Sequence, residues 1–136
     1  MAKDVEVSIG NALTKIVFRD DDGDVIAWFK INLMDARLPG KLGEVAAFLR
    51  TQSFDGSVVE KLEQLDNALV EKFNYLLGYD CRDTLFGRLS PTTVFSDGDM
   101  FTTKILHRIS ESFIEEVKAR AAQRAAAVEK FTAKYN

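Results

Sequence analysis

The fold is decided by residues 14–32, which read TKIVFRDDDGDVIAWFKIN. Two runs rich in β-branched and aromatic residues, 14–19 and 25–32, flank an acidic stretch that contains Asp22-Gly23. Asp-Gly between two such runs is a strong hairpin signal, because glycine accepts the positive φ that a tight hairpin turn requires. The sequence therefore predicts a β-hairpin that turns at Asp22-Gly23.

Both faces of this predicted hairpin carry large apolar side chains. One face collects Ile16, Phe18, Ala27, Phe29 and Ile31, and the other collects Val17, Ile26 and Trp28 among Lys15, Arg19 and Lys30. A small domain rarely has enough helix to cover both faces of a sheet. The second face is therefore expected either to be covered by another element or another chain, or to stay partly exposed.

The residues before the hairpin also show a period of two. Val5, Val7 and Ile9 alternate with polar residues, which predicts a short half-exposed strand and leaves two alternatives for the sheet, the hairpin alone or three strands. The same alternation is unlike the apolar core of a signal peptide or a basic transit segment.

The pattern becomes helical from Leu33 onward. Leu38-Pro39-Gly40 predicts a break, followed by a helix over 41–51 that buries Leu42, Val45, Ala46 and Leu49. Ser57 and Glu60 predict a capping box for a helix that runs to residue 77, where Gly78 stops it. The apolar positions of that helix are Val58, Leu62, Leu65, Leu69, Phe73 and Leu76.

The last third of the chain predicts one long helix after a connection. Residues 79–97 hold a glycine and a proline and predict a loop with one short helical turn at 83–86. Asp97 or Asp99 is the expected cap of a helix that reaches almost to the C-terminus, and its end is rich in alanine and basic residues. The apolar stripe is Phe101, Ile105, Ile109, Phe113 and Val117.

These patterns together predict an α+β fold that is mostly helical. An N-terminal hairpin region, 1–32, precedes a helical region, 33–136, that forms a bundle of three to four helices. A chain of 136 residues with 46% hydrophobic residues falls in the size range of a single domain, 1–136.

Composition argues against several classes of partner. Eighteen basic against twenty-one acidic residues give a net charge of −3, whereas nucleic-acid binders usually present a basic face. Apolar runs stay far below the ~20 residues that span a bilayer. Cys81 is the single cysteine and cannot form an internal disulfide, which suits a reducing compartment. We therefore expect neither nucleic acid nor membrane as a partner.

The candidate chemical groups do not combine into a known site. His107 is the single histidine and lies between apolar helix positions, and Cys81 has Asp80 and Asp83 beside it, which disfavour a thiolate. Asp20, Asp22 and Asp24 resemble the start of a calcium loop, but Val25 and Ile31 stand where that loop needs glycine and glutamate. The expectation is a protein that is not an enzyme and has no metal site and no cofactor.

One stretch has a family resemblance. Asn74-Tyr75-Leu76-Leu77-Gly78-Tyr79-Asp80, followed by Thr84-Leu85-Phe86-Gly87, resembles a pattern in the small tail assembly chaperones of long-tailed bacteriophages. In that pattern a helix ends in an aliphatic pair and glycine, an aspartate follows, and a short segment closes on Phe-Gly. The order of elements is similar too, with Phe29-Lys30-Ile31-Asn32 ending the hairpin and Asp35 and Arg37 after it. The resemblance covers residues 13–117.

The resemblance implies a non-catalytic role. Such chaperones bind the long tape measure protein, keep it soluble and help recruit tail tube subunits, and many are also made in a longer, frameshifted form. They act in the host cytoplasm and are not expected in the mature particle. They tend to self-associate, which agrees with the two apolar faces of the hairpin and predicts a homo-oligomer.

Two alternatives remain beside the chaperone. The chain could be a structural or adaptor protein of a phage particle, or a small cytosolic regulatory protein. In each case the residues expected at a protein interface are the apolar groups that are hardest to bury within the chain, namely Val17, Ile26, Trp28, Leu85 and Phe86.

Overall fold

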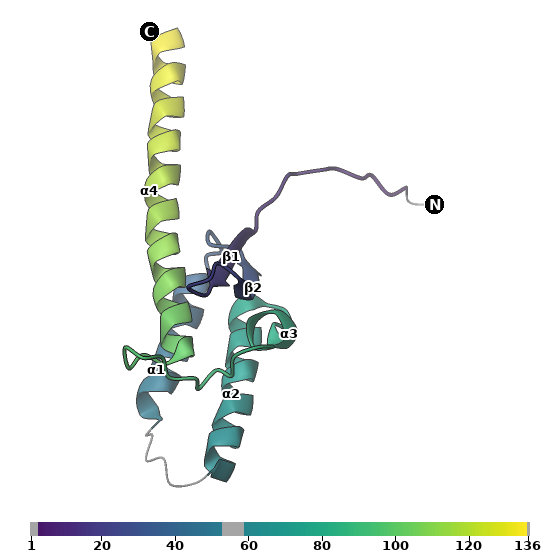
Figure 1. The fold of residues 1–136 in the computed structure, drawn as a ribbon. Coiled ribbons are helices and arrows are strands. Elements are labelled where there is room, and N and C mark those ends of the chain that lie inside the picture. The colour runs from purple at the N-terminus through teal and green to yellow at the C-terminus, as the bar shows by residue number, and fades with distance from the viewer. Residues whose placement is uncertain (1–2, 53–58, 136) are drawn as a thin grey trace.

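A computed structural model describes residues 3–52 and 59–135 of the chain (Figure 1). The elements are β1 (Thr14–Arg19), β2 (Val25–Ile31), α1 (Leu38–Thr51), α2 (Val59–Leu77), α3 (Arg82–Leu85) and α4 (Phe101–Tyr135). The predicted class, a mostly helical α+β fold with an N-terminal hairpin and a long C-terminal helix, is confirmed. Within the described part, none of the helices is both long and apolar enough to cross a membrane.

The hairpin forms in the predicted register. β1 and β2 pair antiparallel, with Ile16 opposite Phe29 and Val17 opposite Trp28, so the two faces carry the predicted side chains. Gly23 adopts a φ of +86° in the turn, where an L side chain would be strained. The carboxylate of Asp20 accepts hydrogen bonds from the amides of Asp22 and Asp24 at 3.0 and 2.9 Å and closes the turn.

Of the two alternatives for the sheet, the one with a third strand is wrong. Within the described residues the sheet has two strands, and residues 3–13 run away from the body as an extended segment (Figure 1). Val5, Val7 and Ile9 are 84%, 73% and 90% exposed. Alternation stabilises a strand only when one of its faces becomes buried, and nothing in this arrangement covers these three side chains.

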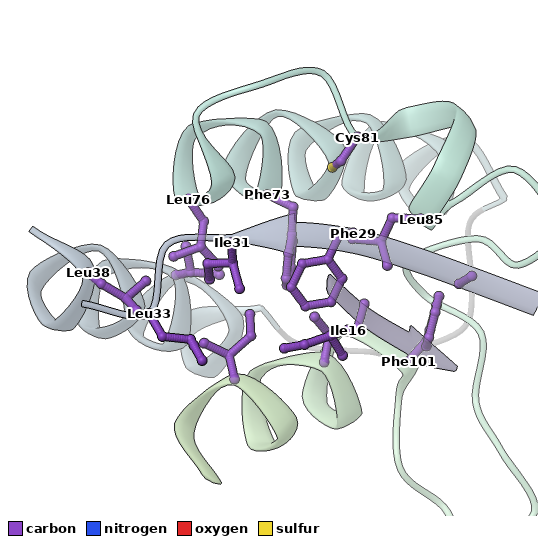
Figure 2. Close-up of a cluster of buried hydrophobic side chains, with 14 residues drawn as sticks. Ile16, Phe29, Ile31, Leu33, Leu38, Phe73, Leu76, Cys81, Leu85 and Phe101 are labelled. Atoms are coloured by element: carbon purple, nitrogen blue, oxygen red, sulfur yellow. The ribbon is translucent and has the colours of Figure 1, made fainter. Parts of the chain in front are cut away.

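The core lies between the inner face of the hairpin and the helices (Figure 2). Ile16, Phe29 and Ile31 from the hairpin meet Phe73 of α2 and Phe101 of α4. Phenylalanine rings link the layers: Phe18 packs edge-on against Phe101 with ring centroids 5.7 Å apart, and it stacks on Phe29 at 6.2 Å. One buried cluster therefore joins the hairpin to the helices.

Helix α1 begins earlier than predicted, at Leu38 instead of residue 41. Pro39 lies in the first turn of α1, where backbone amides make no hydrogen bond within the helix, so a residue without an amide proton is tolerated there. The predicted break is therefore the start of the helix. Val45 is buried and Leu42, Ala46 and Leu49 are half-buried, on the predicted face. The capping box predicted at Ser57 and Glu60 depends on Ser57, which lies outside the described residues.

Helix α4 has two contrasting halves. Phe101, Ile105 and Ile109 are buried in the first half, as predicted, whereas residues 118–133 are exposed throughout. Asp97 remains in the turn before the helix, where its carboxylate accepts the Asp99 amide at 3.0 Å and pairs with Lys104 at 2.5 Å. With 1.5 Å of rise per residue the 35-residue helix is about 52 Å long, and its second half projects beyond the rest of the molecule (Figure 1).

Candidate protein-binding surfaces

The stretch that resembles tail assembly chaperones forms a tight corner at the end of α2. Gly78 ends the helix at a φ of +81°, and its amide donates to the carbonyl of Asn74 at 2.8 Å. The side-chain oxygen of Asn74 accepts the Cys81 amide at 2.8 Å and the Cys81 thiol at 3.1 Å. The residues of the motif therefore fix the path of the chain from α2 into α3.

The end of this corner is part of the core, which corrects one interface prediction. Leu85 is 0% exposed, so the expectation that it is hard to bury within the chain is wrong. Phe86 is half-buried, with its ring edge-on to Phe73 at 5.7 Å and to Phe101 at 5.9 Å. A side chain at Gly87 would collide with the carbonyl oxygen of Asp83, which explains the glycine after Phe86.

The outer face of the hairpin, formed by Val17, Ile26 and Trp28, is left partly exposed. Val17 is 37% exposed, and Ile26 and Trp28 are half-buried. The ammonium group of Lys15 lies 4.4 Å from the centroid of the Trp28 ring, a cation–π contact that leaves the charge at the surface. Within the described residues, no other element of the chain fully covers this face, so it stays partly exposed in the single chain.

The free edge of β2 is partly occupied by side chains. The Lys30 amide donates to the hydroxyl of Tyr79 at 2.8 Å, and the guanidinium of Arg88 donates to the carbonyl of Val25 at 3.1 Å. These bonds satisfy edge groups that would otherwise invite another strand. The outer hairpin face is an apolar part of the sheet that stays partly exposed in the single chain.

A second surface, which the sequence did not indicate, is a groove between α1 and α4. It has a volume of about 620 Å³. Ala46 and Leu49 form the wall on α1, and Leu106 and Ile114 lie on the α4 side together with the exposed His107. The groove depends on how two helices far apart in the sequence lie side by side, so periodicity within either helix could not reveal it.

The groups considered for chemistry lie apart. Burial raises the pKa of the Cys81 thiol to about 12, and hence the thiol is protonated at neutral pH and a poor nucleophile. His107 is exposed at the groove, on another element than Cys81. Over residues 3–52 and 59–135, no group of three or more histidine, cysteine or acidic side chains could hold a metal ion.

Comparison with protein-family models, with curated proteins and with solved structures gave no match. Any function has to be argued from the surfaces described above and from the sequence resemblance.

Proposed function

We propose that this chain is a non-catalytic tail assembly chaperone that binds the tape measure protein of a long-tailed phage and keeps it soluble. In this role it also helps recruit tail tube subunits and acts in the host cytoplasm, without remaining in the mature particle. The proposal starts from the resemblance over residues 13–117. It is supported by a surface suited to binding protein and by the chemistry of the buried thiol.

The observation that carries the proposal is the half-exposed outer face of the hairpin. Val17, Ile26 and Trp28 place branched and aromatic side chains side by side on one face of the two-stranded sheet. A long helical client exposes apolar stripes before it is assembled, and covering such a stripe is favourable by about 25 cal/mol per Å² of apolar surface removed from water. Lys15, beside Trp28, keeps this face soluble when it is empty.

The corner at 74–87 supports the same proposal in a different way. Its glycines, Asn74 and Leu85 determine the fold, so the residues shared with the chaperone pattern are explained by structure. A shared pattern of this kind favours a similar scaffold, on which the binding residues lie elsewhere. We therefore assign client binding to the outer hairpin face and not to Leu85.

Co-expression with a tape measure protein from the same source tests the proposal. The client should be soluble with this chain, the two should co-purify, and the complex should survive moderate salt, because apolar burial is not screened as exposed ion pairs are. Purified particles should lack the chain, whereas a structural or adaptor protein would be present in them. A client that is equally soluble alone would refute the chaperone role.

Trp28→Glu is the sharpest variant for locating the binding face. It should abolish co-purification, because it places a charge where a client must pack. Met34→Glu is a matched control, since Met34 is also an exposed apolar residue, 44% exposed, but lies in the loop after β2. Circular dichroism should show both variants folded. A folded Trp28→Glu variant that still binds the client would exclude this face.

A further inference from the structure

The exposed side of α4 carries a continuous seam that runs from the groove to the projecting half of the helix. Ile114, Val117 and Val128 are 51%, 39% and 56% exposed. Together with Ser110 and Ala121 they are spaced by three, four or seven residues, so all five lie along one side of the helix. This is the spacing of a helix that packs along a second helix.

The seam begins in the groove between α1 and α4. Thr103, His107, Ser110 and Ile114 are its first four positions, and all of them line that groove. The second half of α4 lacks any such wall over residues 118–130, which are exposed. An unpacked helical segment of this length is marginal in water even with many alanines, so it gains most from a partner.

The charges along α4 point to the nature of that partner. Glu111, Glu115 and Glu116 make residues 111–116 acidic, whereas Lys118, Arg120 and Arg124 make the next stretch basic. A second α4 in parallel register would set like charges level with each other, which is unfavourable. In antiparallel orientation, with Ile114 level with Val117 of the second copy, residues 111–113 lie against the basic residues 118–120 of that copy, and Glu115 and Glu116 lie at the two-fold axis.

We propose that two copies of this chain associate through antiparallel α4 helices, each projecting half lying along the groove of the other copy. In the proposed register Ile114 lies against Val117 of the second copy, and His107 lies against Arg124. The same register sets Ser110 against Ala121 and brings Glu111 beside Lys118. The acidic residues already make exposed ion pairs within their own helix, such as Arg120 with Glu116 at 2.7 Å, and such pairs are weak enough to rearrange.

This proposal is independent of the client. In this dimer the two copies meet through α4 and not through the hairpin, where the sequence suggested self-association. The outer hairpin face stays free to bind a client. The failure of one proposal therefore says nothing of the other, because the dimer is tested with the purified chain alone.

Light scattering and cysteine cross-linking of the full chain test the proposal. The mass should be twice the 15.2 kDa of one chain. Under oxidation the double variant Ser110→Cys with Ala121→Cys should form a covalent dimer, whereas each single variant should not, because each residue lies about 16 Å along the axis from its own counterpart. The native Cys81 is buried and stays out of the reaction.

Charge reversal gives a second, reciprocal test. Glu111→Lys and Lys118→Glu should each weaken the dimer by about tenfold, and the double variant should restore it, because only the double variant recovers opposite charges across the seam. Glu63→Lys, at an exposed position of α2, is the matched control and should leave the dimer unchanged. A monomer at all concentrations, or cross-linking by either single cysteine variant, would overturn the antiparallel dimer.

Discussion

Replacing Leu85 by alanine should lower the free energy of unfolding by about 3 kcal/mol. Leu85 is 0% exposed and belongs to the cluster formed by the hairpin, α2 and α4, so the deletion leaves a cavity inside the core. A domain of this size is stable by about 5–15 kcal/mol, and hence the variant should still fold. Its melting temperature should fall by roughly 10 °C.

Urea unfolding followed by circular dichroism measures this change, with Val17→Ala as the comparison. Val17 is 37% exposed and packs beside Trp28 across the hairpin, so its truncation should cost no more than about 1 kcal/mol. The two variants should thus separate a core residue from a surface residue. If Leu85→Ala left the unfolding free energy unchanged but abolished client binding, the assignment of Leu85 to the core would be refuted. Leu85 would then be an interface residue.

Three further variants test other parts of the structure. Cys81 should resist a thiol reagent in the folded protein. The pKa of its thiol is near 9 in the unfolded chain and about 12 in the folded one. The free energy of unfolding should therefore fall above pH 9, by up to about 1.4 kcal/mol per pH unit. Cys81→Ala should flatten that fall in urea titrations from pH 8 to 11; an unchanged slope would show that another group causes it. Thr102→Val should raise the unfolding free energy by about 1 kcal/mol, since the buried Thr102 hydroxyl has no hydrogen-bond partner among the described atoms. His107→Gln should leave client co-purification unchanged, and loss of binding by a folded variant would reveal a role for this exposed side chain.

Features set by local chemistry were predictable from the sequence. Gly23 and Gly78 both adopt a positive φ, and the sequence predicts a turn and a helix end at these positions because few other residues tolerate that conformation. The faces of the hairpin follow from the same turn, since a period of two fixes every side chain once the turn residue is known. Pro39 indicates a helix boundary, but the sequence alone does not show that it lies in the first turn of α1.

Features that depend on distant elements were not predictable. Leu85 lies in a loop-rich stretch, and only the meeting of β2, α2 and α4 around it makes the site apolar. Val5, Val7 and Ile9 show the reverse case. Their alternation is typical of a strand, but these side chains stay exposed because no other described element packs against them. The groove beside Leu49 and Ile114 likewise arises from the placement of α1 against α4. The sequence of either helix alone does not predict it.

The projecting half of α4 changes how this protein moves through solution. A compact chain of 136 residues has a radius of gyration of about 14 Å, equivalent to a sphere about 36 Å across. Helix α4 alone is about 52 Å long and therefore exceeds that diameter. A single chain will experience more friction than a sphere of equal mass and will leave a gel-filtration column early, at the volume of a larger globular standard. X-ray scattering from the monomer should accordingly give a largest dimension of at least about 52 Å, an elongation that elution volume alone would mistake for added mass.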